Sequence, residues 1–282
     1  MIIDLHTHSN ASDGELSPAE LVKAAHQAGI RVLALTDHDT VAGIPEAIQA
    51  ASEEGVRLIP GVELSSCWQK MDVHIVGLDV DSACPQFLQR LQEQMQRRLQ
   101  RAQIMAEKLD RLGCHQSFKA AAANAPRGIP ARPHFAQVLV DQGLCQNRKQ
   151  AFTRYLKVAK PAYVKTEWPE MAQAVHWIHQ AGGKAVLAHP GRYPLTRAKL
   201  NRLVTAFVEA GGDALEVSVS THTPDMVRQL ADLTHRYGLY ASQGSDYHGP
   251  STRWVQLGKM PALPSQCQLL MAESRASAGS SV

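Results

Sequence analysis

The sequence contains few cysteines and few aromatic residues, and it lacks any long hydrophobic run. Its five cysteines include no Cys-x-x-Cys pair, and the odd number argues against a disulfide framework and for a reducing cytoplasm. No basic segment precedes an apolar run near Met1, so no signal peptide is expected. No apolar stretch approaches the roughly 20 residues that a transmembrane helix needs. These absences favour a cytoplasmic protein without a membrane span.

The length and apolar content suit a globular α/β protein. Apolar residues make up 44% of the 282 positions, which is sufficient for one large domain or one domain with an insertion. Only the polar tail over 273–282 has a composition typical of disorder.

Charge is distributed unevenly, although the net charge is only +3. Residues 85–165 contain 15 Lys and Arg against 4 Asp and Glu, whereas the remaining positions contain 14 against 22. A basic segment attached to an acidic body suggests an anionic substrate held against metal-binding carboxylates. The alternative from charge alone is a solvated helical surface.

Short apolar runs alternate with amphipathic segments, which is typical of repeated βα units around a parallel sheet. Ser17 and Glu20 form a capping-box pattern, Pro18 suits the first helical position, and Gly29 ends the predicted helix. A second helix is expected over 43–54. The predicted strands lie at 2–6, 32–36, 57–64, 72–80, 184–190, 214–220 and 240–246. Seven strands are one fewer than a regular eight-stranded barrel contains.

The alternation stops between the fourth and fifth predicted strands. Residues 85–165 are predicted to form helices only, including a long helical run over 87–113. We therefore expect a basic helical insertion at 85–165. The barrel domain is then discontinuous and consists of residues 1–84 and 166–282.

Side chains that bind metals recur where the predicted strands end. They are His6 and His8 at the first strand, Asp13 in the loop after it, His38 after the second, Glu63 at the third, His74 on the fourth, and Asp246 and His248 after the last. The carboxyl ends of barrel strands converge on one face, where barrel enzymes keep their active sites. A single His-x-His pattern is often accidental, and a lone histidine is often a core residue. Recurrence at several strand ends favours a metal site.

The donor types restrict the metal. Oxygen and imidazole donors without thiolate disfavour a structural zinc site and favour Mn²⁺, Fe²⁺ or catalytic Zn²⁺. The donors are too numerous for one ion, so we expect two or three. A carboxylate such as Glu63 can bridge two ions about 3.5–4 Å apart, the spacing that clamps a phosphoryl transition state.

Four segments, DLHTHSNASDG, ALTDHDT, PGVELS and SDYHG, resemble in this order the motifs of the PHP family (polymerase and histidinol phosphatase), a relative of the amidohydrolases. The resemblance covers the barrel segments at both ends of the chain. It implies an α/β fold, a distorted seven-stranded (β/α) barrel, with a three-metal site that frequently contains manganese. Ordinary amidohydrolases bridge their ions with a carboxylated lysine, so Glu63 in that place argues against C–N bond hydrolysis.

The resemblance also implies how the donors are shared. One ion would be held by His6, His8, Glu63 and Asp246, a second by Glu63, His74 and His134, and a third by Asp13, His38 and His248. Glu216 and His222, near the sixth strand, are candidates for orienting these donors. Because His134 belongs to the insertion, the insertion would cover the mouth of the active site.

The insertion and the segment LAHPGRY resemble nucleoside 3′,5′-bisphosphate phosphatases, whose close relatives trim RNA from its 5′ end. The implied reaction converts a substrate such as adenosine 3′,5′-bisphosphate to AMP and phosphate by attack of a metal-bound hydroxide. Arg132 is the predicted bidentate phosphate clamp, and Arg192 is expected on the same face. His189 is the candidate proton or hydrogen-bond donor to the leaving oxygen. Arg101 and Lys165 are further candidates for substrate contact, with solvated surface charge as the alternative for each.

Three functions remain open at this point. They are a bisphosphate phosphatase, a 5′-3′ exoribonuclease acting on short or 5′-phosphorylated RNA, and a non-catalytic, metal-stabilised nucleic-acid-binding module. The complete donor set argues against the third. Aromatic residues make up only 5% of the chain and are scattered in the insertion, which favours a small ligand over a long single strand. No protein partner is implied.

Overall fold

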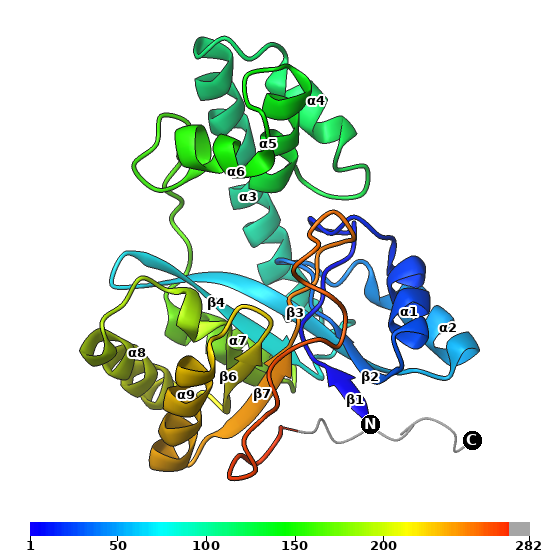
Figure 1. Ribbon diagram of the computed structural model, residues 1–282, viewed down its shortest axis with the longest axis vertical. Coiled ribbons are helices and arrows are strands. Elements are labelled where there is room, and N and C mark those ends of the chain that lie inside the picture. The colour runs from blue at the N-terminus through cyan, green and yellow to red at the C-terminus, as the bar shows by residue number, and fades with distance from the viewer. Residues whose placement is uncertain (271–282) are drawn as a thin grey trace.

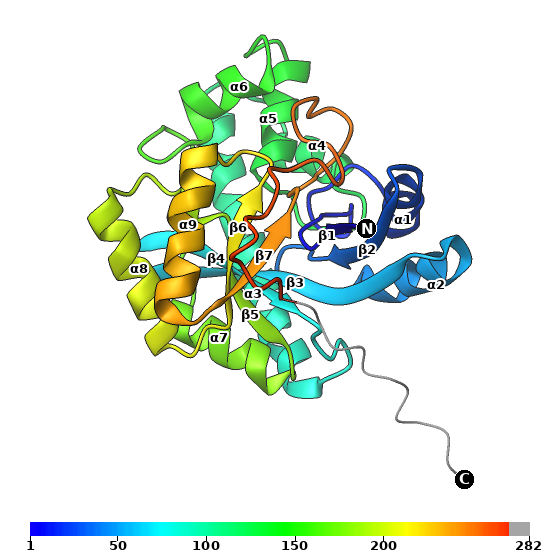
Figure 2. The same cartoon turned by 60° about the horizontal axis from the view of Figure 1, so that its bottom comes forward.

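A computed structural model describes residues 1–270, which form an α/β fold around a seven-stranded sheet (Figures 1 and 2). The predicted disordered tail at 273–282 lies outside the described residues. The strands neighbour one another in chain order. They are β1 (Ile2–Asp4), β2 (Ile30–Leu35), β3 (Arg57–Trp68), β4 (Met71–Leu78), β5 (Lys184–Leu187), β6 (Ala214–Val219) and β7 (Tyr240–Gly244). All seven predicted strands are therefore confirmed.

Helices lie outside the sheet and above it (Figure 1). The α-helices are α1 (Pro18–Gln27), α2 (Ile44–Glu54), α3 (Pro85–Arg111), α4 (Ser117–Ala123), α5 (Arg132–Asp141), α6 (Arg148–Ala151), α7 (Met171–Gln180), α8 (Arg197–Glu209) and α9 (Pro224–Tyr237). A π-helical turn, η1 (Phe152–Leu156), follows α6, and a 3₁₀ turn, η2 (Pro190–Arg192), follows β5. None of the helices within residues 1–270 is both long and apolar enough to cross a membrane.

The first two helices begin and end as their sequences predict. The Ser17 hydroxyl accepts a hydrogen bond from the Glu20 backbone N–H at 3.2 Å, and the Glu20 carboxylate accepts one from the Ser17 N–H at 2.8 Å. This reciprocal pair satisfies N–H groups that the first turn of α1 leaves without partners. Helix α2 ends at Gly55, whose φ of 67° favours glycine.

The sheet is not wholly parallel, which corrects the expectation of repeated parallel βα units. Strand β4 pairs antiparallel with both β3 and β5. Only Gln69 and Lys70, with φ of 48° and 66°, join β3 to β4. A two-residue turn of this kind joins antiparallel neighbours, whereas a parallel crossover takes a dozen or more residues. Because β4 runs in reverse, its amino half, with His74 opposite Ser65, lies beside the carboxyl half of β3.

The two edge strands meet beyond their ends. Thr7 and Tyr247 form an isolated parallel bridge, and the Leu5 backbone N–H donates to the Gln243 carbonyl at 3.0 Å. Strands β1 and β7 share no continuous ladder within residues 1–270. The sheet is thus a distorted seven-stranded barrel, as the resemblance to the PHP family implies, and it does not close completely.

Two hydrophobic layers hold the barrel together. The smaller layer consists of strand residues that face the interior, such as Val32, Ile59 and Val186. The larger layer packs the outer face of the sheet against α1, α2, α7, α8 and α9. Apolar side chains therefore fill the middle of the barrel, and the polar side chains described below gather at one end.

All regular structure between β4 and α7 is helical, as predicted. Helices α4, α5 and α6 lie above the sheet and are connected to it through α3 (Figure 1). They form a separate hydrophobic cluster with the outer half of α3, which includes Leu109, Phe135 and Leu139. This separate core supports a distinct helical unit. Its exact limits at 85 and 165 stay a prediction.

Candidate metal centre

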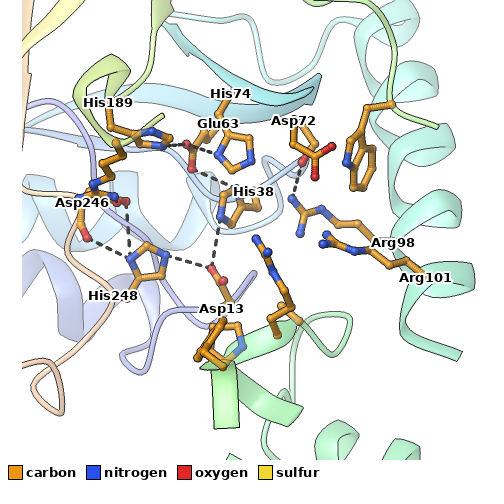
Figure 3. Close-up of a pocket in the computed structure, with 17 residues that line it drawn as sticks. Asp13, His38, Glu63, Asp72, His74, Arg98, Arg101, His189, Asp246 and His248 are labelled. Atoms are coloured by element: carbon orange, nitrogen blue, oxygen red, sulfur yellow. Dashed lines mark hydrogen bonds and ion pairs between the residues drawn. The ribbon is translucent and has the colours of Figure 1, made fainter. Parts of the chain in front are cut away.

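Side chains on or after strands β2, β3, β4, β5 and β7 line one cavity (Figure 3). His6 and His8, which follow β1, contact the Glu63 carboxylate of this cavity. His6 and His8 follow β1, His38 follows β2, Glu63 lies on β3, His74 on β4, His189 follows β5, and Asp246 and His248 follow β7. Two of the positions after strands have a left-handed backbone, with φ of 31° at His189 and 55° at Asp246. Such conformations are strained for residues other than glycine and concentrate at functional sites. The strand-end prediction therefore identified one spatial cluster.

Glu63 is the centre of this cluster. Its carboxylate is 1% exposed, and five imidazoles approach it. Oε1 lies 2.8 Å from His74 Nδ1 and 2.9 Å from His189 Nε2. Oε2 faces the other three rings, which belong to His6, His8 and His38, at 3.0–3.3 Å. The two oxygens thus face different sets of donors, as a bridging carboxylate requires.

Asp246 and Asp13 complete two further sets. Asp246 Oδ1 lies 3.3 Å from His6 Nε2 and 3.0 Å from His8 Nε2. Asp13 Oδ1 lies 3.4 Å from His248 Nε2. Three groups have donor atoms within 4.8 Å of one another: His6, His8, Glu63 and Asp246; His8, Asp13, His38 and His248; and His38, Glu63 and His74. The first group is the predicted set for one ion, and the second contains the predicted set for another.

The donors fit divalent cations. Oδ1 of Asp13, Oδ1 of Asp246 and Nδ1 of His38 are buried, and although each has a neighbour in the cluster at 3.0–3.4 Å, none of these contacts has the geometry of a hydrogen bond. His6 Nε2 and His8 Nε2 lie only 3.1 Å apart, and each of these nitrogens can donate an electron pair to a metal ion. Buried polar atoms normally have partners, and cations placed among these atoms would supply them. Nitrogen and oxygen donors without sulfur match Mn²⁺, Fe²⁺ or Zn²⁺.

The pKa shifts of the cluster show that its carboxylates are ionised and attract positive charge. Burial raises the pKa of Glu63, but the nearby His38, His6 and His74 outweigh burial and hold this pKa well below the usual glutamate value. Burial lowers the pKa of His248, but two aspartates outweigh it and raise the value to about 10. The Glu63, Asp13 and Asp246 carboxylates therefore stay ionised, and the raised pKa values of His6, His8 and His248 favour protons on these three rings where no cation is bound. Divalent ions must displace those protons when they bind.

Glu216 contacts the His6 ring and the backbone of His189. Its Oε1 lies 2.9 Å from His6 Nδ1, which leaves His6 Nε2 to face the cluster, and its Oε2 accepts the His189 backbone N–H at 2.6 Å. Gly244 makes room for this contact, because a Cβ there would lie 2.3 Å from the His6 Cβ and 2.9 Å from Glu216 Oε1. His222 Nε2 accepts the Gly191 N–H at 3.3 Å and so supports the turn after β5. Both residues thus contact the segments that carry the cluster.

Asp37 and Asp39 also support the centre, and the sequence reasoning missed them. Asp37 accepts hydrogen bonds from Ser9 and Ser12 in the loop that carries Asp13. Asp39 accepts the Ser65 N–H at 2.7 Å. Both flank His38 in the motif ALTDHDT, and this position next to a predicted metal donor could have identified them as supporting residues.

Four arginines line the same cavity beside the cluster: Arg98, Arg101, Arg132 and Arg192. Arg192 pairs with Asp246 Oδ2, and its Nε donates to the Thr221 hydroxyl at 2.8 Å. The Arg98 guanidinium donates to Asp39 and to the Ser65 hydroxyl. Arg98 was not predicted, although it lies three positions before Arg101 and therefore on the same face of α3.

Arg101 has a buried guanidinium whose Nε and Nη2 have no partner. Burial, with the positive charge of Arg132 nearby, lowers the pKa of Arg101 to about 10. The Arg101 side chain lies against Trp168, with its Cζ 5.8 Å from the ring centroid. An unpaired, buried guanidinium at a cavity wall is suited to an anionic ligand. Lys165 does not line this cavity but lies in a neighbouring surface pocket.

His134 lies apart from His74, with which the resemblance groups it. Its Nδ1 accepts the Ala131 backbone N–H at 2.9 Å at the start of α5, and its ring lines a different pocket near Asp13. His189 instead shares Glu63 Oε1 with His74. The strand-end rule also applies to His189, which follows β5, but that residue was predicted only as a substrate contact.

A barrel that gathers imidazoles and carboxylates at the carboxyl ends of its strands belongs to the class of metal-binding barrel hydrolases. A PHP domain matches residues 4–181. The chain is 44% identical over 266 residues to the 5′-3′ exoribonuclease Rnm of Escherichia coli strain K12, covering 94% of this chain and 90% of that protein. The chain belongs to the PHP family and is an enzyme of the phosphoesterase type.

Two comparisons concern Chromobacterium violaceum. A 3′,5′-nucleoside bisphosphate phosphatase is 41% identical over 276 residues, which cover 97% of this chain and 96% of that protein. A solved structure of an amidohydrolase, with bound sulfate and no metal, has a TM-score of 0.90 at 40% identity, covering 95% of this chain and 94% of that one. These enzymatic relatives argue against a non-catalytic binding module.

Proposed function

We propose that this enzyme hydrolyses the 3′-phosphate of nucleoside 3′,5′-bisphosphates such as adenosine 3′,5′-bisphosphate. One observation carries the proposal: a single cavity combines the donor cluster with four arginines. A bisphosphate needs two anion sites, one for the phosphate that reacts and one for the phosphate that only binds. The donor cluster suits the first, and the unpaired guanidinium of Arg101 with its neighbour Arg132 suits the second.

The residues of the chain divide the work as follows. Two or three divalent ions, with Mn²⁺ expected first and Fe²⁺ or Zn²⁺ as alternatives, would lower the pKa of water and neutralise the phosphoryl oxygens when bound. Glu63 would join the donor sets. Arg192, anchored by Thr221, would balance Asp246 at the edge of the cluster. Arg132 would fix the non-reacting phosphate and so orient the substrate.

A phosphate-release assay with Mn²⁺ tests this function. Adenosine 3′,5′-bisphosphate should release phosphate and leave 5′-AMP, and 3′-AMP should react less efficiently because it lacks the second phosphate. 5′-AMP should not react. Release of the 5′-phosphate, or no release from any of the three compounds, would contradict the proposal.

The second ion has an alternative ligand in this structure. We propose that His189 holds it with Glu63 and His74, in place of the predicted His134, because both rings approach the same carboxylate oxygen. His189→Asn should therefore lose about one metal equivalent per chain, and His134→Asn should lose none, as measured by elemental analysis. The reverse pattern would restore His134 as the ligand and leave His189 as the proton donor.

Arg132→Ala tests the phosphate clamp. A charge-assisted bidentate contact is worth about 1.5–3 kcal/mol, so kcat/KM on the bisphosphate should fall roughly ten- to a hundredfold. Arg132→Lys should recover only part, because an ammonium lacks the planar fork. Arg127→Ala is the matched control, since Arg127 belongs to the same basic segment but pairs with Glu46 outside the cavity. Equal kinetics for Arg132→Ala and the control, at unchanged metal content, would show that Arg132 does not bind the phosphate.

A 5′-3′ exoribonuclease is the second candidate function. The relative from Escherichia coli carries this name, and both activities can use the same donor cluster. The bond broken is then the one between O3′ of the first nucleotide and phosphorus, as in the bisphosphate. A second cavity beside the centre bears on this candidate.

A further inference from the structure

A second cavity opens from the metal centre and has different walls. It shares six lining residues with the cavity described above: Asp13, Pro133, Phe152, Arg192, Asp246 and His248. Its volume is about 490 Å³. Its remaining walls come from the loop after β1, the first turn of α6, the residue after η1, and the segments after β6 and β7. We call this cavity the downstream groove. Figures 1 and 2 show the segment after β7, drawn in orange, beside the helical unit in both views.

Trp254 is the most unusual residue of the downstream groove. It is 78% exposed, whereas Val255 and Leu257 beside it are buried in the main hydrophobic core. The Val255 N–H donates to the Thr252 carbonyl at 3.0 Å, which closes a turn around Trp254. The indole is therefore held at the groove by an anchored turn, although it contributes little to the core. An aromatic side chain held at the wall of a cavity can serve as a platform on which a nucleobase stacks.

The charge of the groove favours an anion. Its acidic wall residue outside the metal cluster, Glu15, already accepts hydrogen bonds from Arg148 at 3.1 Å and from the Ser251 N–H at 3.1 Å. Lys149 and Lys157 are exposed and form no ion pair within the described part of the chain. Two uncompensated ammonium groups therefore flank a groove that begins at the phosphate-reacting centre. An aromatic platform with nearby cations is the arrangement that binds single-stranded nucleic acids.

We propose that the downstream groove binds the nucleotide that follows the scissile phosphate in a 5′-phosphorylated oligoribonucleotide. Trp254 stacks on the base of that nucleotide, and Lys149 and Lys157 contact the phosphates beyond it. This inference rests on the proposed function, because the first nucleotide and the scissile phosphate occupy the same positions as the bisphosphate. A bisphosphate ends at the scissile phosphate and does not enter the groove.

The reaction balances in the same way for both substrates. The oxygen of water bonds to phosphorus, the P–O3′ bond breaks, and O3′ takes one proton while the other is released. The bisphosphate yields a nucleoside 5′-phosphate and inorganic phosphate. The oligonucleotide yields a nucleoside 5′-phosphate and an oligonucleotide that is one residue shorter and carries a 5′-phosphate. Trp254 offers a single exposed stacking platform in the groove, so most of the gain in affinity should be reached with one or two downstream nucleotides.

Steady-state kinetics on two substrates test the inference: adenosine 3′,5′-bisphosphate and a 5′-phosphorylated triribonucleotide. Trp254→Ala should raise KM for the triribonucleotide roughly five- to a hundredfold, the range measured for loss of one stacked base. KM for the bisphosphate should change less than about twofold, because that substrate does not reach the groove. Trp254→Phe should retain most of the affinity, since a smaller aromatic ring still stacks.

Charge reversal gives an independent readout. Lys157→Glu should raise KM for the triribonucleotide and make it less dependent on salt concentration, because one phosphate contact is lost. Lys199→Glu is the matched control, since Lys199 is an exposed lysine of α8 outside the groove. It should change neither KM nor the salt dependence.

The outcomes separate this inference from the proposed function. If the wild-type protein hydrolyses neither substrate, the proposed function fails and the inference fails with it. Hydrolysis of the bisphosphate alone overturns only the downstream groove. Hydrolysis of both substrates with no change in Trp254→Ala, or with an equal change on both, likewise shows that the groove does not bind the second nucleotide.

Discussion

Glu63→Gln should reduce kcat on the bisphosphate by roughly a hundredfold to a few thousandfold while the protein remains folded. The substitution keeps the volume of the side chain but removes the charge that five imidazoles surround. Removing one partner from a buried charged set costs about 3–5 kcal/mol, and each 1.4 kcal/mol in the barrier is tenfold in rate. Phosphate release, elemental analysis and circular dichroism would measure activity, metal content and fold together.

Glu216→Gln is the matched control for this variant. Both glutamates are buried, but Glu216 contacts His6 Nδ1 and a backbone N–H, on the far side of the ring from the cluster. Loss of such an orienting contact typically reduces activity or metal affinity 10- to 100-fold. Near-normal turnover of Glu63→Gln with unchanged metal content, or a larger loss of activity in the Glu216 variant, would show that Glu63 is not the bridging carboxylate.

Prolonged chelation should abolish phosphate release, and Mn²⁺ should restore it. The three donor groups can hold cations, and in the proposed mechanism it is the bound cations that activate water. Removing the cations should therefore remove the activity. Metal should also stabilise the fold, because ions bind the assembled cluster and not the unfolded chain. At a hundredfold excess over Kd this binding contributes about 2.7 kcal/mol, which corresponds to a rise in Tm of roughly 5–10 °C.

Thermal denaturation of chelated and Mn²⁺-loaded protein would measure the stabilisation. A Ca²⁺-loaded sample is the control for general ionic effects, since imidazole-rich sites suit Mn²⁺ better than Ca²⁺. Full activity in chelator, together with an unchanged Tm, would show that the enzyme needs no metal ion for its activity or its stability.

Local sequence patterns predicted most of the fold. The Ser17–Glu20 capping box and Gly55 are local signals, because each makes its hydrogen bonds or backbone turn within a few residues. The direction of β4 was missed for the opposite reason. Alternating apolar residues predict a strand but not its partner, and the short turn at Gln69–Lys70 determines the direction. That turn contains neither glycine nor asparagine, the usual residues with positive φ.

The centre was predicted through one geometric rule, that strand ends of a barrel converge. The rule applies directly to His6 and Asp246, which follow β1 and β7, whereas Glu63 lies within β3, which continues to Trp68. Contacts between segments far apart in the chain were beyond the rule. The guanidinium of Arg98 reaching Asp39 across 59 positions and the place of Trp254 opposite the helical unit depend on tertiary packing.

The number of bound ions measured against activity tests the central claim most directly. Metal-free protein would be titrated with Mn²⁺, and bound manganese per chain and phosphate release from adenosine 3′,5′-bisphosphate would be followed on the same samples. Because Glu63 joins donor groups on both of its oxygens, turnover should stay near zero through the first equivalent and rise as the second binds. Full turnover with one ion would contradict the bridging role of Glu63, and full turnover with none would contradict the metal centre itself.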